Sequence, residues 1–462
     1  MDTKKLRQKI LDLAIRGKLV PQDPNDEPAS VLLERIRAEK ERLIKEGRIK
    51  RSKKSASDTP HYENVPFEVP EGWEWCHVSD IFELNPKNDV PDDTQSGFIP
   101  MACVDDGFGY AHSFETRPWG EIRKGYSHFQ NGDIGIAKIS PCFENRKSTI
   151  FYDLPNGIGA GTTELTVLRG HCINIEFYLY LFQSEWYIFE GTKEFKGVVG
   201  QQRVNKEIFT TLIIPLPPIE EQNRIVTEIK KWFSLIDTLE TAKEDLQESI
   251  AQAKSKILDL AIHGKLVPQD PNDEPAVELL KRINPKFTPC DNAHYENVPK
   301  GWSKIKVGEL AQYTNGKAFQ PTDWEQNGLP IIRIQNLNDE NCKYNYTSIN
   351  HEEKYRISNG DLLFAWAASL GVYIWQGNDA WLNQHIFKVE PHPFIDKHFL
   401  YYLFQYLISE FYNRSHGSGM VHITKKEFET TTALLPPLSE QRRIVKSIES
   451  CYATLDNISA NL

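Results

Sequence analysis

The sequence predicts a mixed α/β (α+β) fold in which two similar globular domains are joined by long antiparallel helices with pseudo-two-fold symmetry. Three observations lead to this prediction. Residues 9–29 return almost unchanged as residues 256–276, with His263 in place of Arg16. Each copy precedes a long segment in which short apolar runs alternate with Gly, Pro and Asn. A coiled-coil-like apolar pattern follows the first of these segments. A repeat of so long a period indicates two large halves rather than a solenoid.

Matching markers divide each half in the same order. His-Tyr-Glu-Asn-Val-Pro occurs twice, Gly-Trp follows each copy, and each half ends on Pro-Pro-[Ile/Leu]-x-Glu-Gln-x-Arg-Ile-Val. The flanking segments barely differ between the halves, whereas the sequences between them diverge. We therefore predict constant frames that carry two variable inserts. The expected segments are half of a helical region with a linker (1–60), a first globular domain (61–215), a central helix with a Pro-rich segment (216–293), a second globular domain (294–435) and the other half of the helical region (436–462).

Inside the globular domains the pattern predicts strands and one prominent helix each. Runs rich in Val, Ile and Phe, bounded by turn residues, read as strands, and apolar residues at helical spacing read as helices. A Gly-Asp pair precedes one strand in each domain, at residues 132–133 and 360–361. The expected strands are 134–139, 163–168, 329–334 and 361–366, and the expected helices are 177–189 and 399–412.

The frames are predicted to be helical. Between residues 220 and 262 apolar residues recur at steps of four and three, which is typical of a coiled coil. At 1.5 Å per residue this helix would be about 65 Å long. Gly17 and Gly264 stand where a glycine commonly ends a helix. The apolar seam comprises Ile225, Ile229, Trp232, Ile236, Leu239, Leu246, Ile250 and Ile257.

The two ends of the chain complete one more helix of the same kind. The C-terminal frame followed by the N-terminal frame reproduces almost all of the central helix. This arrangement is typical of a circularly permuted, closed two-fold object. We expect both termini to lie near the middle of the molecule, within about 30 Å of each other, where a second long helix is split in two.

Composition narrows the class of protein. The chain has 462 residues, of which 40% are hydrophobic, and this is enough for several packed cores. A net charge of −10 counts against a uniformly basic surface. The longest apolar run is too short to span a bilayer, and no signal segment begins the chain. The seven cysteines form no Cys-x-x-Cys pair, which favours free thiols in a reducing cytoplasm and no metal site.

Positive charge is concentrated in residues 34–54, which hold ten Lys or Arg against four Glu. Two interpretations stay open: a solvated helix face that continues into a tail, or a contact to DNA phosphate or an acidic partner. No P-loop, dinucleotide-binding turn, serine-hydrolase elbow or zinc-protease motif is present. We therefore predict no catalytic residues. The chain is expected to bind and recognise a ligand rather than to catalyse a reaction.

These motifs together resemble the specificity subunit of type I restriction–modification systems, in a circularly permuted arrangement. The resemblance rests on the Pro-x-Gly-Trp opening of each domain, the Gly-Asp strand, the Pro-Pro-x-x-Glu-Gln-x-Arg-Ile-Val helix start and the Ile-Leu-x-Leu-Ala-Ile-x-Gly-Lys-Leu-Val-Pro-Gln segment. It covers essentially the whole chain, and every motif occurs twice. Many members begin directly with the first variable domain, whereas this chain begins with half a frame.

The resemblance implies that each variable domain is a target recognition domain that reads one half of a bipartite, asymmetric site on double-stranded DNA. It further implies that the helices set the spacer and dock two modification (methyltransferase) subunits, which restriction/translocase subunits join. On this view the near identity of the frames presents one dock twice. Catalysis would belong to the partner subunits, which use S-adenosylmethionine, ATP and Mg, and this chain would need no cofactor.

The residues that read bases are expected among Arg, Lys, Asn, Gln and His on loops. In the first domain we select Lys138, Asn145, Arg146, Lys147, Gln201, Gln202 and Arg203. In the second domain we select Trp366, Asn383, His385, His422 and Lys425. For three of these a structural role is an open alternative: a surface ion pair for Arg203, a core position for Trp366 and a strand cap for His385.

Three other functions stay open at this point. The chain could be an enzyme that acts alone, a coiled-coil scaffold with two ligand-binding domains, or a specificity chain of a related single-polypeptide or phase-variable system.

Overall fold

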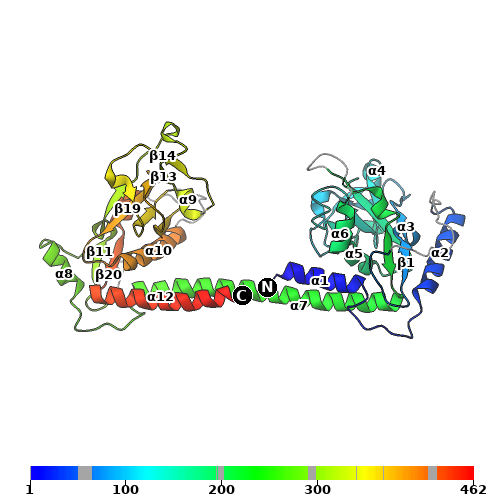
Figure 1. The fold of residues 1–462 in the computed structure, drawn as a ribbon, viewed down its shortest axis with the longest axis horizontal. Helices are drawn as coiled ribbons and strands as arrows, with labels where there is room; N and C mark the ends of the chain where they lie inside the picture. The colour runs from blue at the N-terminus through cyan, green and yellow to red at the C-terminus, as the bar shows by residue number, and fades with distance from the viewer. Residues whose placement is uncertain are drawn as a thin grey trace. The chain divides into compact units, whose positions relative to one another are not determined.

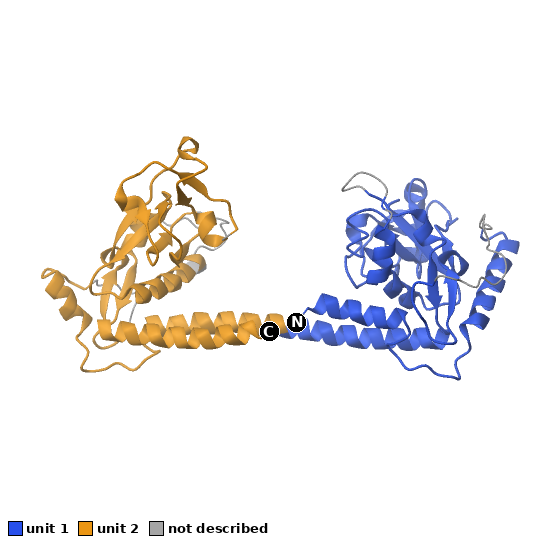
Figure 2. Cartoon of the chain, in the orientation of Figure 1, with its two compact units in different colours: residues 1–242 blue, residues 243–462 orange. Residues whose placement is uncertain are grey.

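The computed structural model describes residues 2–49, 65–193, 195, 202–289, 298–339, 341–367, 369–414 and 424–462. The chain divides into two compact units, residues 1–242 and 243–462 (Figure 2). Each unit contains one globular domain and the helices next to it in sequence, and the boundary between the units falls within the predicted central segment 216–293.

A single long helix, α7 (Ile219–Ile262), begins in the first unit and ends in the second. Its bounds are within one residue of the predicted range of 220–262, and its 44 residues correspond to about 66 Å. Pro217 and Pro218 directly precede the helix, where proline is tolerated because the first N–H groups need no helical partner. The prediction of one continuous central helix is confirmed.

In the first unit, α1 (Thr3–Ile15) lies along α7 in the antiparallel direction (Figure 1). Arg7, in the first half of α1, contacts Asp237 and Glu240, whereas Gln22, beyond its end, reaches back to Glu221. The helix ends at Ile15, and the left-handed backbone follows two residues later, as expected from the sequence.

In the second unit, α12 (Leu438–Ala460) pairs with the other end of α7, again antiparallel. Lys254 Nζ lies 2.5 Å from Asp456 Oδ1, and Tyr452 donates a hydrogen bond to the Lys254 carbonyl oxygen at 3.1 Å. Each unit thus contains one terminal helix laid along α7. The proximity of the two chain ends stays a prediction.

The two domains have the same sheet topology, strand for strand. Each contains a two-stranded sheet and two four-stranded sheets, ordered β1-β10, β2-β9-β6-β7 and β4-β3-β8-β5 in the first and β11-β20, β12-β19-β16-β17 and β14-β13-β18-β15 in the second. In both, the one parallel pair among the described strands joins the third strand to the eighth, as β3-β8 and β13-β18. The expected fold class, two similar α/β domains joined by long helices, is confirmed.

In the first domain the strands are β1 (Glu74–His77), β2 (Phe82–Leu84), β3 (Gln95–Ile99), β4 (Glu115–Pro118), β5 (Ser127–Gln130), β6 (Ile134–Ala137), β7 (Ser148–Ile150), β8 (Ile158–Gly161), β9 (Leu165–Gly170) and β10 (Ile213–Leu216). Its helices, with the neighbouring α2, are α2 (Ala29–Lys45), α3 (Val78–Ile81), α4 (Trp119–Ile122), α5 (Ile175–Gln183) and α6 (Glu185–Thr192).

In the second domain the strands are β11 (Ser303–Lys306), β12 (Ala311–Asn315), β13 (Leu329–Ile332), β14 (Asn345–Thr347), β15 (Arg356–Ile357), β16 (Leu362–Ala365), β17 (Gly371–Ile374), β18 (Ala380–Leu382), β19 (Ile386–Pro391) and β20 (Thr432–Leu435). Its helices, with the neighbouring α8, are α8 (Ala276–Ile283), α9 (Ile334–Asn338), α10 (Lys397–Arg414) and α11 (Lys425–Thr430).

The four predicted strands and the helix at 399–412 are confirmed, with shifts of a few residues at their ends. The helix predicted at 177–189 is instead two helices, α5 and α6, which meet at Ser184. The Ser184 hydroxyl accepts a hydrogen bond from the Tyr187 N–H and caps α6. Apolar periodicity continues across this break, and therefore the sequence pattern alone did not reveal it.

The helices and the domain of each unit share one hydrophobic core. In the first unit Leu11 and Ile15 of α1 and Ile229 of α7 belong to the same buried cluster as Tyr178 and Phe182 of α5. In the second unit Ile262, Phe399 and Ile444 are members of one cluster. The apolar seam of the frame therefore anchors each domain as well as pairing the helices. In the part of the chain that the structure describes, no helix combines the length and apolar character needed to cross a bilayer.

Candidate nucleic-acid interface and helix junctions

Three segments that are far apart in the sequence meet at one buried carboxylate in the first unit. Glu221, in the first turn of α7, is 1% exposed. Its Oε2 accepts a hydrogen bond from Trp73 Nε1 at 2.8 Å, and its Oε1 accepts one from Gln22 Nε2 at 2.7 Å. Burial raises the pKa of Glu221, and both hydrogen bonds oppose that rise. We call Gln22, Trp73 and Glu221 the first junction.

The second unit contains the same arrangement. Glu440, in the first turn of α12, is also 1% exposed. It accepts hydrogen bonds from Trp302 Nε1 at 3.0 Å and from Gln269 Nε2 at 3.1 Å. Burial raises the pKa of Glu440 in the same way, against the same two hydrogen bonds. We call Gln269, Trp302 and Glu440 the second junction.

An ion pair accompanies each junction. Arg224 Nη1 and Nη2 lie 3.0 and 2.5 Å from the two carboxylate oxygens of Asp26, and Arg443 contacts Asp273 in the same two-pronged way. Such bidentate pairs are stronger and more directional than single contacts. The Pro-rich segment of each frame is thereby held against the first turns of α7 in the first unit and of α12 in the second.

The junctions assign an internal role to much of the repeated sequence. The Gly-Trp, Glu-Gln-x-Arg and Pro-Gln-Asp motifs, which are well separated in the chain, converge on one carboxylate in each unit. The resemblance implies that their near identity presents one dock twice. The structure adds that these residues must recur because each unit rebuilds the same buried cluster.

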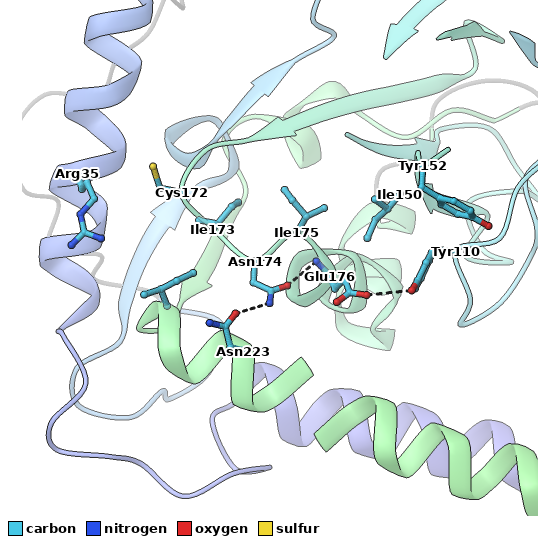
Figure 3. Close-up of a pocket in the computed structure, with 11 residues that line it drawn as sticks. Arg35, Tyr110, Ile150, Tyr152, Cys172, Ile173, Asn174, Ile175, Glu176 and Asn223 are labelled. Atoms are coloured by element: carbon cyan, nitrogen blue, oxygen red, sulfur yellow. Dashed lines mark hydrogen bonds between the residues drawn. The ribbon is translucent and has the colours of Figure 1, made fainter. Parts of the chain in front are cut away.

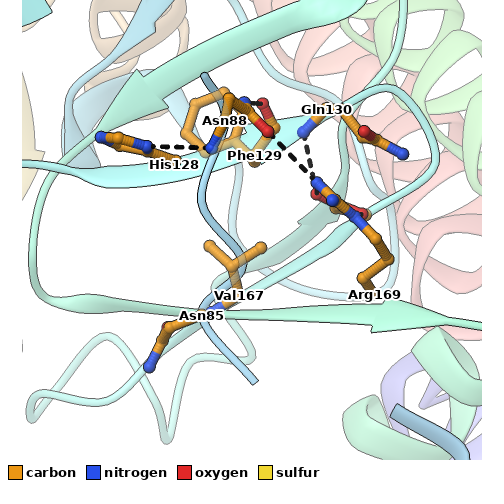
Figure 4. Close-up of polar contacts among 8 residues, drawn as sticks. Asn85, Asn88, His128, Phe129, Gln130, Val167 and Arg169 are labelled. Atoms are coloured by element: carbon orange, nitrogen blue, oxygen red, sulfur yellow. Dashed lines mark hydrogen bonds and ion pairs between the residues drawn. The ribbon is translucent and has the colours of Figure 1, made fainter. Parts of the chain in front are cut away.

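The Gly-Asp motif forms a turn with a charged partner in both domains. In the first, the carboxylate of Asp133 accepts a hydrogen bond from the Gln130 N–H and pairs with Arg169 at 2.8 Å. Arg169 also donates a hydrogen bond to Asn88 Oδ1 at 3.5 Å (Figure 4). Burial raises the pKa of Asp133, and Arg169 opposes the rise. In the second, Asp361 pairs with Lys388 at 3.3 Å. The motif is therefore structural.

The structure brings together the two groups of DNA-contact candidates in the first domain. Ile139 and Arg203 form an antiparallel bridge, and Ser140 donates a backbone hydrogen bond to the Gln202 carbonyl oxygen at 2.9 Å. Lys138 lies next to this bridge and Asn145 is exposed. Gln201 lies outside the described residues. This side-by-side arrangement of the two loops was not evident from the sequence.

Two candidates in this region are engaged within the domain. Arg146 donates hydrogen bonds to the carbonyl oxygens of Gln183 and Glu144 and lies over the ring of Phe108, and burial lowers its pKa. Lys147 pairs with Asp106 at 3.2 Å, and its side chain is 16% exposed. Both cations are used internally, which favours a structural role over base contact.

Arg203 combines exposure with an ion pair. Its guanidinium forms two hydrogen bonds to Glu164, at 3.0 and 2.7 Å, yet its side chain is 51% exposed. The hydrogen bond from Arg203 lowers the pKa of Glu164. Exposed ion pairs of this kind stabilise a protein by only about 0–1 kcal/mol. The guanidinium can therefore readily leave Glu164 and bind another anion or a base.

In the second domain Trp366 and His385 lie together. Trp366 donates a backbone hydrogen bond to the His385 carbonyl oxygen, and its indole Nε1 donates to Asn315 at 3.2 Å. Asn383 pairs with Lys317 through an isolated parallel bridge. Lys425 begins α11 and pairs with Glu429 at 3.6 Å. His422 lies outside the described residues.

Trp324 and Arg333 form an exposed aromatic–cation pair that was not predicted from the sequence. Trp324 is 42% exposed, and the guanidinium of Arg333 lies 5.7 Å from the centre of its ring. Glu325 and Ser348 hold this loop to the next one by a hydrogen bond of 2.9 Å. Exposed aromatic and Arg side chains side by side are typical of nucleic-acid contacts. The only available signal was a Trp in a turn-rich segment.

The predicted partner-docking seam divides into two sets. The chain itself buries Ile225, Ile229 and Ile236, which belong to the core of the first unit. Ile250 is also buried, at 7% exposure, and Ile257 is half-buried. The four buried residues are therefore inaccessible to a separate subunit. Trp232, Leu239 and Leu246 are 39%, 44% and 38% exposed, respectively.

Leu235 adds to the exposed set, since it is 49% exposed and lies one turn from both Trp232 and Leu239. We call Trp232, Leu235 and Leu239 the α7 stripe. In the second unit Ile458 of α12 is 43% exposed, and it follows the Glu-Gln-x-Arg motif at the same spacing as Leu239.

Where the structure describes the basic segment 34–54, several of its cationic side chains are engaged in ion pairs or hydrogen bonds within the chain. Arg42 pairs with Glu39 and Glu46, and Arg35 pairs with Glu27. Lys40 donates hydrogen bonds to three backbone carbonyl oxygens at the end of α3 and the start of β2. This favours the interpretation of a helix face, and residues 50–54 lie outside the described part.

An open groove of about 1030 Å³ is lined by α2, the start of α7 and the first domain (Figure 3). Several of its polar lining groups make internal contacts: Asn174 donates to Asn223 at 2.8 Å and caps α5, while Glu176 accepts hydrogen bonds from Tyr110 and Lys230. We therefore interpret the groove as a contact region between the domain and the helices and not as a ligand site.

Comparison with known proteins places this architecture among DNA-specificity subunits. A family model described as "Type I restriction modification DNA specificity domain" matches residues 70–248 and 299–462. The type I restriction enzyme EcoAI specificity subunit of Escherichia coli is 36% identical, across 98% of this chain and 90% of that protein. The EcoEI specificity subunit of Escherichia coli is 35% identical, across 99% of this chain and 90% of that protein.

Two solved structures share the fold. One, from a study of the complex assembly and conformational transition of the type I R-M system, has a TM-score of 0.60 at 20% identity and covers 86% of this chain and 94% of that one. The HsdS subunit from Thermoanaerobacter tengcongensis has a TM-score of 0.53 at 19% identity, with 85% and 93% covered.

The chain belongs to the specificity subunits of type I restriction–modification systems. It is a DNA-specificity subunit and not a catalytic one, as the resemblance implied.

Proposed function

We propose that each domain of this chain reads one half of a bipartite, asymmetric DNA site, and that the helices fix the spacer and dock two methyltransferase subunits. The observation that carries the proposal is the pairing of identical topology with divergent sequence: the two domains agree strand for strand but differ in their loops. Equal frameworks with unequal loops suit two unlike half-sites at a set separation.

For the first half-site, the proposed contacts are centred on the Ile139–Arg203 bridge. Arg203 is exposed and weakly held, Asn145 is exposed, and both residue types can recognise bases in the major groove. For the second half-site, His385, Trp366, Asn383 and Lys425 remain the proposed set, together with Trp324 and Arg333. The proposed base contacts also include three residues selected from the sequence alone, which are Gln201, Gln202 and His422.

For the methyltransferase subunits, the proposed dock is the α7 stripe and its counterpart around Ile458. Exposed large apolar side chains on a helix are typical of partner surfaces. Restriction/translocase subunits would join that core, and S-adenosylmethionine, ATP and Mg would be bound by these partners. The function places the chain in the cytoplasm, where chromosomal DNA is accessible.

Methylation mapping tests the proposed function. In a host that expresses this chain with its methyltransferase subunit, we expect methylated adenines at one bipartite motif with a fixed spacer. The same host without this gene should lose that motif completely. Methylation at a continuous motif, or unchanged methylation without the gene, would contradict the proposal and favour an enzyme that acts alone or a scaffold.

Substitution of Arg203 by alanine tests the base-reading assignment. We expect about a 5- to 100-fold loss of affinity and relaxed preference at one position of one half-site, because a base contact is worth about 1–3 kcal/mol. The preference for the other half-site should not change. Competition binding to single-base variants of the site measures both effects. Unchanged affinity and preference would leave Arg203 with only its ion pair to Glu164.

A further inference from the structure

The junctions stand where each domain is attached to the helices. Trp73 directly precedes β1, and Glu221 lies in the first turn of α7, which follows β10. Strand β1 pairs with β10, with Glu74 opposite Leu216, so that both attachment points of the domain are at the same edge. The second junction is placed in the same way around β11 and β20.

In each junction both carboxylate oxygens accept a hydrogen bond. Both oxygens of Glu221 are occupied, one by the domain entry and one by the Pro-rich segment, and the group is buried. A tilt of the domain on its helix would break a hydrogen bond to a buried charge, which is costly because no water replaces the lost donor. The same holds for Glu440.

Close backbone packing reinforces this restraint. Gly17 has a left-handed backbone, and a Cβ there would lie 2.4 Å from Pro70 and 3.0 Å from the ring of Trp73. Gly264 stands in the same relation to Pro299 and Trp302. The indole is therefore held on one side by the frame and at its nitrogen by the carboxylate.

Selection of one spacer length requires restrained domains. One added base pair moves a half-site by about 3.4 Å along the duplex and rotates it by about 35°. A domain that could tilt on its helix would accept neighbouring spacers. A stiff helix alone does not prevent this, because the attachment of each domain to the helix must be stiff as well.

We infer that Trp73–Glu221–Gln22 and Trp302–Glu440–Gln269 are positioning residues that restrict this protein to one spacer length, separately from the residues that read bases. The inference rests on the proposed function. On this inference the junctions restrain the angle of each domain on its helix, and α7 sets only the distance.

The test uses the complete chain assembled with its methyltransferase subunit. The substrate is a DNA library in which the two half-sites are separated by every spacer length around the preferred one, and methylated positions are read by sequencing. The variants are Trp73→Phe and Trp302→Phe, which keep an aromatic ring and delete the N–H donor. Matched controls are Trp119→Phe and Trp381→Phe, because these residues are 2% and 1% exposed in the same two units but lie outside the junctions.

We expect each junction variant to methylate sites with spacers one base pair longer or shorter about tenfold more, relative to the preferred spacer, than the wild type does. This is the change in equilibrium that corresponds to one lost hydrogen bond in a buried site. The half-site bases should be unchanged, and the controls should keep the wild-type ratio even if their thermal stability falls.

Two results would overturn the inference: folded junction variants with the wild-type spacer ratio, or altered half-site bases at an unchanged spacer. If Trp73→Phe does not fold, Glu221→Gln provides the same test, since it keeps the volume and an acceptor for Trp73 but confronts Gln22 with a second donor. A wild-type complex that methylates no bipartite motif would instead refute the proposed function, and the two failures are therefore distinguishable.

Discussion

Replacement of Trp232 and Leu239 by aspartate is expected to abolish stable association with the methyltransferase subunit. Both side chains are exposed in the chain alone, 39% and 44% respectively, and both belong to the α7 stripe. Burial of one such side chain in an interface is worth about 1.5–3 kcal/mol. Loss of two should weaken binding about 100-fold or more, and the buried charges would add to this loss.

The measurement is the dissociation constant of the purified chain with its methyltransferase subunit. Ser234→Asp is the matched control, since this exposed residue lies on the same helix but away from the stripe. The thermal stability of the double variant should equal that of the wild type, because no core contact is lost. Wild-type affinity in the double variant would show that the dock lies elsewhere.

Substitution of Gly17 by alanine is expected to destabilise the first unit by about 2–5 kcal/mol. The residue has φ of +65°, where an alanine costs about 1–2 kcal/mol. The added Cβ would also lie 2.4 Å from Pro70 Cγ, and such overpacking costs about 1–3 kcal/mol more. Urea denaturation, followed by the fluorescence of Trp73 and its neighbours, measures the loss.

Gly47 supplies the control within the same unit. Its φ of +70° is equally left-handed, yet no atom lies within 4 Å of a Cβ built there. Gly47→Ala should therefore cost only the backbone term of about 1–2 kcal/mol. Equal losses for the two variants would mean that the contact with Pro70 does not restrain the domain entry.

Much of the framework could be predicted because it depends on local periodicity and on repeated motifs. The steps of four and three after residue 220 placed α7 within one residue of its bounds, and alternating apolar runs located strands such as β6 and β16. The helix end before Gly17 also followed from local chemistry, because a left-handed residue there favours glycine. These features need no knowledge of distant neighbours.

The roles of individual side chains could not be predicted in the same way. Lys147 and Arg146 looked available for DNA in the sequence, but Asp106 and the Gln183 carbonyl oxygen occupy them across the fold. Ile225 and Trp232 share one apolar pattern, yet the core buries only the first. Which member of a pattern faces outward depends on packing partners that are remote in sequence.

The pairing of β1 with β10, and of β11 with β20, has a consequence for how such chains can change. Because the ladder clamps the two ends of each insert together, substitutions in the loops beyond it need not disturb the helices. A whole insert could be exchanged for another of different sequence if its two end strands fit the ladder. The fold thus separates the loops of each insert, whose sequence can vary, from the helices and the strand ladder, whose sequence must be kept.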